Sequence, residues 1–200
     1  MSRFVIVSYY TPSYERVAKK YLIDSLVMMD LPFKVTKIHW EEDWKENTDY
    51  KPVFIKECLQ KFSGIDIVFI DADAEVRQHP TLFYNIPKEY HMACHYLDWE
   101  LQYGRPTDKG KTELLSGTLY FKNDDPKVME LIDRWIENTK QYPWEQMALD
   151  MALRPDINVY KLPREYCYIL TQPKGQPPAV QIEKPVIAHH QYGRIMKKLL

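Results

Sequence analysis

Cysteine is scarce in this chain, and its few residues form no pattern. Cys58, Cys94 and Cys167 are the only three among 200 residues. Their odd number, wide spacing and lack of a CxxC pair predict neither a disulfide framework nor a zinc site. Free cysteines are the rule in a reducing compartment, so a cytoplasmic location is expected.

The chain also lacks long apolar runs and an excess of either charge. Residues 4–7 are too few for the apolar core of a signal peptide, and no stretch has the length needed to cross a membrane. The formal net charge of −1 argues against a broad surface for polyanions, although a local basic patch is compatible with it. With 200 residues, 45% of them hydrophobic, we expect a soluble protein with a single domain, 1–200, and a sizeable core.

The most informative stretch is 65–76, which reads IDIVFIDADAEV. Five of the six residues at 65–70 are apolar, which is typical of a strand buried on both faces. Asp71 and Asp73 follow at once, and in an extended chain their carboxylates would point the same way, about 6–7 Å apart. Two such charges repel each other unless a positive group lies near, and a hard divalent cation is the natural partner. An Asp-rich turn after a buried strand is the simpler alternative.

The first predicted strand, 4–7, opens into a polar and aromatic turn that contains Ser8, Tyr9, Tyr10 and Thr11. A turn of this kind between a strand and a helix is a common nucleotide site. Either tyrosine can stack on a base, and Ser8 or Thr11 can bond the edge of that base. Capping of the next helix explains the same residues equally well.

Apolar periodicity predicts alternating strands and helices along the rest of the chain. A charged loop is expected at 40–50, followed by a helix that begins at Lys51 and has Pro52 in its first turn. Lys51 lies on the element just before the strand that leads to the Asp pair. From that position its side chain can reach a phosphate or an Asp carboxylate. The other expected elements are strands at 33–39, 91–96, 114–121, 157–161 and 186–188, and helices capped by Ser13, capped by Asp125, and following Pro143.

Two segments depart from this alternation. Residues 98–113 are polar, and a loop of this length in a compact domain is usually functional, so we expect a mobile lid or an acceptor-binding loop there. The strand at 114–121 is interrupted by Ser116 and Gly117. Glycine weakens a strand unless something approaches its backbone closely, so a ligand is the preferred explanation and a β-bulge the alternative.

The last predicted strand, 186–188, leads to His189 and His190. Adjacent strand residues point to opposite faces, so only one of these imidazoles can face a given site. Together the elements predict an α/β fold with a mostly parallel sheet flanked by helices. Asp71, Asp73 and His189 would then hold Mn²⁺ or Mg²⁺, with open positions for a diphosphate.

Four motifs occur in order along the chain: DADAEV, LLSGTLYFKND, WEQMALDMAL and VIAHHQYGR. They resemble the landmarks of a GT-A-type (Rossmann-like) nucleotide-diphospho-sugar glycosyltransferase with a DxD motif, in particular the glycogenin-like groups, over nearly the whole chain. Many relatives have aspartate where this chain has Glu145. The resemblance implies metal binding by Asp71, Asp73 and His189, and nucleotide contacts by Tyr9 and Thr11. It implies donor-sugar contacts by Ser116 and Gly117, and contacts with the donor sugar or the acceptor by Glu145 and Gln146.

The implied reaction builds negative charge on a departing nucleoside diphosphate, which a metal stabilises as a Lewis acid and Lys51 or Arg194 supports. The expected donor is a UDP-sugar, and the acceptor is an unidentified hydroxyl compound. Inversion at the sugar requires a general base, for which Asp98, Glu113 and Glu145 are candidates. The pattern resembles retaining groups more than inverting ones. Basic residues at 105, 109 and 111 hint at an anionic acceptor.

Three other functions compete with this interpretation. A DxD phosphatase usually carries Thr or Val at the position of Glu75 and has its motif on the first strand. A sugar nucleotidyltransferase usually has a Gly-rich, basic loop after the first strand, which SYYTPSYER lacks. A non-catalytic nucleotide- or sugar-binding domain would leave the two aspartates and the histidine unexplained.

Overall fold

A mixed six-stranded sheet forms the centre of the computed structural model, which describes residues 4–39, 43–172 and 176–191. The strand order is β2-β1-β3-β6-β5-β7. β1 runs parallel to β2 and β3, β5 runs parallel to β7, and β6 is antiparallel to both of its neighbours. The expected α/β fold with a mostly parallel sheet is confirmed, with β6 as the reversed strand. The strands are β1 (Phe4–Tyr10), β2 (Phe33–Lys37), β3 (Asp66–Ile70), β5 (Met92–Asp98), β6 (Thr112–Phe121) and β7 (Val159–Lys161).

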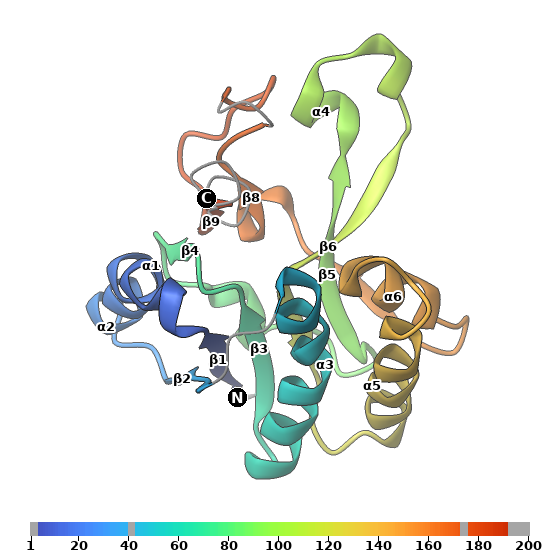
Figure 1. Ribbon diagram of the computed structural model, residues 1–200. Coiled ribbons are helices and arrows are strands. Elements are labelled where there is room, and N and C mark those ends of the chain that lie inside the picture. The colour runs from blue at the N-terminus through green and yellow to red at the C-terminus, as the bar shows by residue number, and fades with distance from the viewer. Residues whose placement is uncertain (1–3, 40–42, 173–175, 192–200) are drawn as a thin grey trace.

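Helices cover both faces of this sheet (Figure 1). Alternate residues of β3 explain why: Ile67 and Phe69 pack toward the helices α3, α5 and α6, whereas Val68 and Ile70 pack toward the side of α2. The buried strand predicted from the apolar run is therefore correct. The α-helices are α1 (Glu15–Ala18), α2 (Asp24–Met28), α3 (Trp44–Lys61), α4 (Trp99–Tyr103), α5 (Pro126–Thr139) and α6 (Glu145–Ala152), with a π-helical turn (Lys19–Ile23) between α1 and α2 and short 3₁₀ turns at Pro12–Tyr14, Thr81–Tyr84, Pro106–Asp108 and Arg164–Tyr166. None of the described helices has the length and hydropathy of a membrane span.

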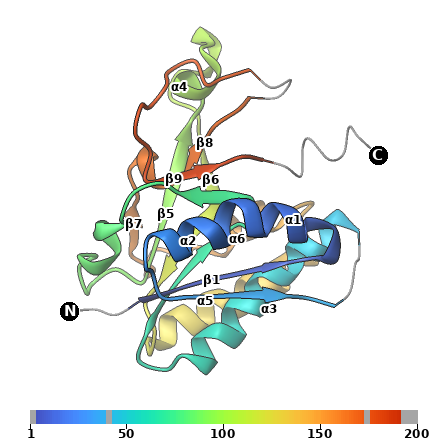
Figure 2. The same cartoon turned by 90° about the vertical axis from the view of Figure 1, so that its left-hand side faces the viewer.

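A second, three-stranded sheet brings the C-terminal part of the chain to the Asp pair. Its order is β4-β9-β8, from β4 (Ala74–Val76), β8 (Tyr168–Ile169) and β9 (Ile187–His189). β9 is antiparallel to β4, and Ala74 is paired with His189. Figure 2 shows this sheet beside the upper edge of the central sheet, next to α1 and α2. The register therefore places the end of β9 directly beside the residue that follows Asp73.

The helix α3 begins earlier than expected, and the loop predicted at 40–50 is wrong for its described part from residue 44 on. Asp43 caps the helix: its side chain accepts from the backbone of Glu46, whose side chain in turn accepts from the backbone of Asp43. Pro52 lies inside this helix rather than in its first turn. The capping box and the favourable burial of the later turns outweigh the hydrogen bond that the proline cannot donate.

Within the segment 98–113, residues 99–111 form an excursion between β5 and β6 with its own secondary structure, α4 and a 3₁₀ turn (Figure 1). Asp98 caps α4, and backbone bonds from Ala179 and Val180 to the carbonyls of Gln102 and Leu101, at 3.0 and 2.9 Å, tie α4 to a later segment. The irregular loop expected from the sequence is thus partly helical. Its mobility stays a prediction.

Candidate active site

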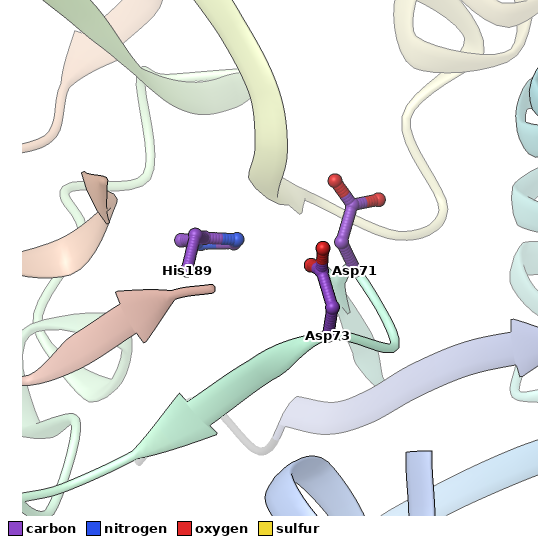
Figure 3. A group of neighbouring side chains, drawn as sticks. All are labelled: Asp71, Asp73 and His189. Carbon is purple, nitrogen blue, oxygen red and sulfur yellow. The ribbon is translucent and has the colours of Figure 1, made fainter. Parts of the chain in front are cut away.

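Asp71 and Asp73 lie in a turn rather than on an extended strand. β3 ends at Ile70, and the backbone N–H of Ala74 donates to the carbonyl of Asp71 at 3.0 Å. The expected alternation along a strand is therefore wrong as the reason for their proximity. The turn directs both carboxylates toward His189, and one ligand atom from each of the three lies within 4.8 Å of the other two (Figure 3). The structure thus brings together the three metal ligands expected from the sequence.

The orientation of His189 is fixed by Thr118. Nε2 of the imidazole and the hydroxyl of Thr118 share a hydrogen bond of 2.8 Å, which leaves Nδ1 as the nitrogen for a metal. Burial lowers the pKa of His189 to about 4; Asp71 opposes this shift and Lys51 adds to it. The imidazole is therefore neutral near pH 7, and the neutral form is the one that binds metals. His190 points elsewhere: its ring packs at a tilt against Tyr21, and its Nε2 lies 3.3 Å from Glu75.

Gly117 leaves the space in which the ligands meet. A Cβ atom on this residue would lie 2.9 Å from Cε1 and 3.1 Å from Nδ1 of His189, and 3.2 Å from Oδ2 of Asp71. The strand is also bulged here, because the β5–β6 register shifts between Cys94 and His95, so both explanations given for this glycine describe part of the geometry. Hard carboxylate oxygens, a neutral imidazole nitrogen and this opening fit a divalent ion such as Mn²⁺ or Mg²⁺.

Gly117→Ala is expected to weaken Mn²⁺ binding about tenfold or more, because the locked imidazole cannot yield to the new methyl group. Isothermal titration with Mn²⁺ measures the effect. Gly110→Ala is a suitable control: a Cβ there meets open space, although its positive φ of 76° makes the substitution strained. We expect Gly110→Ala to lower stability without changing Mn²⁺ affinity, and equal affinities for the two variants would contradict the role given to Gly117.

Lys51 is a buried cation between two carboxylates. Only 3% of the residue is exposed, and its Nζ lies 2.7 Å from Oε1 of Glu145 and 3.0 Å from Oδ1 of Asp71. Burial alone would lower the pKa of Lys51, but Asp71 and Glu145 outweigh it and raise the pKa, so the amine stays charged. Nζ also donates to the carbonyl and the hydroxyl of Ser116, at 3.3 and 3.2 Å. Lys51 therefore links α3 to the turn after β3, the bulge of β6 and the start of α6.

Among the described residues, only one carboxylate oxygen of Glu145 has hydrogen-bond partners. Oε1 accepts from Lys51 and from the hydroxyl of Ser116, the latter at 2.8 Å, whereas Oε2 is buried and has no hydrogen-bond partner among the described residues. Burial raises the pKa of Glu145, and Lys51 offsets part of this shift. A buried acceptor without a donor is costly, so Oε2 is a candidate for a ligand hydroxyl.

The side-chain amide of Gln146 completes the bulge. Its Oε1 accepts from the backbone N–H of Ser116 at 3.1 Å, and its Nε2 donates to Glu113 at 2.6 Å. Ser116 has no ladder partner in the β5–β6 register, so its N–H and C=O are free to bond Gln146 and Lys51. The structure thus gathers Ser116, Gly117, Glu145 and Gln146 beside the acidic cluster.

The predicted nucleotide residues lie at the end of β1. The hydroxyl of Tyr9 donates to the carbonyl of Asn47 at 2.6 Å, and its ring packs against Tyr50 and Phe54. Thr11 is buried and shares a bond of 3.1 Å with Ser13. Thr11, not the expected Ser13, holds the N-cap position of the first 3₁₀ turn. Base stacking by Tyr9 stays a prediction.

Asp98 is not brought to this cluster. Oδ1 of Asp98 accepts from the backbone of Glu100 and Leu101, which is the capping role at α4. Its strand partner is Thr112, four residues or about 13 Å along β6 from Ser116. Arg194 lies outside the described residues.

Tyr14 is a site residue that the sequence did not single out. It belongs to the 3₁₀ turn after β1 and is half-buried. Burial raises the pKa of its hydroxyl, and Asp73 and Asp71 raise it further, which places the hydroxyl in the field of the acidic cluster. Topology could have predicted Tyr14 as a site residue, because the helix after a parallel strand begins at the edge of the sheet where ligands bind.

The α/β sheet, with two carboxylates just after the central strand β3 and an imidazole at the end of β9 that meets them, has the architecture of the GT-A class of glycosyltransferase fold. Residues 1–199 match the nucleotide-diphospho-sugar transferase family, and the chain belongs to that family. Family membership separates it from DxD phosphatases and sugar nucleotidyltransferases. A comparison with curated protein sequences gives no match.

Solved structures show the same fold at low sequence identity. A glycosyltransferase involved in glycosylation of the major capsid of PBCV-1 is 13% identical with a TM-score of 0.69, over 99% of this chain and 100% of that one. The apo form of the glycosyltransferase GlyE from Streptococcus pneumoniae TIGR4 is 13% identical with a TM-score of 0.66, over 95% of this chain and 55% of GlyE. The galactosyltransferase LgtC, in complex with donor and acceptor sugar analogues, is 11% identical with a TM-score of 0.57, over 94% of this chain and 87% of LgtC.

Proposed function

We propose that this protein transfers a sugar from a nucleotide-diphosphate donor, expected to be a UDP-sugar, to a hydroxyl acceptor, and that it requires Mn²⁺ or Mg²⁺. The convergence of Asp71, Asp73 and His189 within 4.8 Å carries the proposal. These three residues would hold the ion, which supplies Lewis-acid stabilisation of the departing diphosphate. The family and the LgtC complex with a donor analogue support a nucleotide-sugar donor.

The residues around the cluster then have separate tasks. Oε2 of Glu145 accepts a hydrogen bond from a hydroxyl of the donor sugar, since Oε1 is held by Lys51 and Ser116. Ser116 and Gly117 present the bulged backbone to the same sugar. The buried charge of Lys51 fixes both acidic side chains before the donor arrives. Tyr9 and Thr11 bind the nucleotide together with Tyr14, and Arg194 adds positive charge near the diphosphate.

We favour retention of configuration at the sugar. An inverting enzyme needs a base with free access to the acceptor hydroxyl. Asp98 caps α4, and Glu145 forms an ion pair with Lys51 on the donor side. The exposed basic residues 105, 109 and 111 on the excursion after β5 favour an anionic acceptor.

A thermal-shift screen of UDP-, GDP- and TDP-sugars with and without Mn²⁺ tests the proposal. At about 100 times Kd, a ligand stabilises the fold by about 2.7 kcal/mol, which corresponds to a shift in Tm of about 5–10 °C for a chain of this size. We expect this shift for UDP-sugars only when Mn²⁺ is present. The variant Asp73→Asn should abolish it and the exposed control Asp133→Asn should retain it.

The outcomes separate the competing functions. Slow Mn²⁺-dependent hydrolysis of the donor supports a transferase. NMR of the anomeric proton of the first product reports whether the configuration at the sugar is retained or inverted. Binding without any turnover supports a non-catalytic binding domain. Absence of a metal-dependent shift with every donor contradicts the proposal.

A further inference from the structure

Glu113 connects the excursion after β5 with the sugar side of the site. It lies on β6, paired with Leu97 of β5. Oε1 of its carboxylate accepts from Nε2 of Gln146 at 2.6 Å, and Oε2 accepts from the indole N–H of Trp99 at 3.2 Å. Each oxygen thus bonds a donor from a different element, α6 on one side and α4 on the other. Bonds to an ionised acceptor are shorter and stronger than neutral ones.

These bonds allow the Gln146 amide one orientation. A backbone N–H can only donate and an ionised carboxylate can only accept. The carbonyl oxygen of Gln146 must therefore face Ser116, at 3.1 Å, and its NH₂ group must face Glu113. Without the carboxylate, the N–H of Ser116 would still favour the carbonyl oxygen, but the NH₂ group would lose its acceptor and the amide would lose its second point of attachment.

Trp99 is itself held within the excursion. It is the first residue of α4, its ring makes an edge contact with Tyr103 at 5.7 Å, and Nζ of Lys111 lies 5.8 Å from its ring centroid. A displacement of α4 would therefore move the indole N–H from which Glu113 accepts a hydrogen bond. The carboxylate is the link through which such a displacement reaches Gln146.

We propose that Glu113 is a positioning residue that fixes the amide of Gln146 for sugar transfer and couples it to Trp99 at the base of α4. The inference rests on the proposed function and assigns a different task from that of a general base. Both oxygens of Glu113 accept hydrogen bonds from donors of the protein, which hold the carboxylate between α6 and α4. Glu113 then holds the excursion, which is the expected acceptor side, in a fixed position relative to the donor pocket.

Glu113→Gln tests this proposal in the full chain. Its single carbonyl oxygen can accept from Gln146 or from Trp99 but not from both, so one bond is lost. We expect kcat for Mn²⁺-dependent donor hydrolysis to fall about tenfold, while donor KM and Mn²⁺ affinity change less than about twofold. Trp99→Phe removes only the indole donor and should lower kcat about threefold. The double variant should match Glu113→Gln alone, because both changes act through one bond network.

The exposed Glu130→Gln on α5 is the matched control and should leave kcat unchanged. A kcat of Glu113→Gln equal to wild type, or strictly multiplicative effects of the two variants, would overturn the proposal. A loss of about a thousandfold, together with the loss of one limb of the pH profile, would identify Glu113 as a base instead. Trp99→Phe keeps the test decisive if Glu113→Gln does not fold.

A second readout separates this inference from the proposed function. The ¹⁵N-labelled side-chain amide of Gln146 gives a hydrogen-bonded NMR signal whether or not the protein turns over a donor. We expect that signal to shift in Glu113→Gln and to stay in Glu130→Gln. If wild type binds no nucleotide sugar, the proposed function fails while the signal still decides the positioning role; an unshifted signal overturns it.

Discussion

Asp73→Asn is expected to lower donor turnover by about a thousandfold, which corresponds to about 4 kcal/mol of barrier. The reason is that an amide at this position removes a charged oxygen ligand and with it much of the affinity for the ion. Asp71→Asn should have at least the same effect, because Asp71 also lies 3.0 Å from Lys51 and supplies part of its countercharge. Activity assays at saturating donor, paired with Mn²⁺ titrations, measure both consequences.

The metal dependence of the two variants distinguishes a ligand from a structural carboxylate. Raising the Mn²⁺ concentration should recover part of the activity of Asp73→Asn, since weakened binding is restored by mass action. The exposed Asp133→Asn keeps the change of charge away from the site and should behave as wild type. Unchanged Mn²⁺ affinity in both Asp71→Asn and Asp73→Asn would show that the cluster does not bind the ion.

Lys51→Met is expected to destabilise the fold by about 3 kcal/mol, as measured by urea unfolding. Removal of the amine leaves the buried carboxylate of Glu145 without its cation and the carbonyl of Ser116 without a donor. The contribution of Asp71 is smaller, because 37% of its side chain is exposed and solvent screens its charge. Donor turnover should fall as well, since Lys51 orients both acidic side chains.

Two further variants check the physical cause. Lys56→Met removes the exposed pair with Asp133, at 2.6 Å, and should cost less than about 1 kcal/mol. The double variant Lys51→Met/Glu145→Gln should recover part of the stability lost in Lys51→Met, because the unpaired charge is then absent. Equal losses for Lys51→Met and Lys56→Met would contradict the role of Lys51 as a buried counterion.

Helix starts and strand irregularities were harder to predict than strands. The capping box at Asp43 and Glu46 lies in a charged stretch whose composition is typical of a loop, and the helix that it starts is buried only from Lys51 on. The bulge at 116–118 depends on the register between β5 and β6, which no local pattern reports. The role of Asp98 as a cap for α4 likewise follows from a helix that the polar sequence at 98–113 did not indicate.

Sequence alone predicts the buried strand β3, the acidic pair after it and the order of the motifs, because apolar runs and short-range spacing encode burial and chemistry locally. Which groups meet depends on the fold. The register of β9 against β4 turns His189 toward the aspartates, and the packing of α3 inserts Lys51 between Asp71 and Glu145. Those contacts join residues far apart in the chain, and their geometry depends on strand register and helix packing, which are properties of the whole fold.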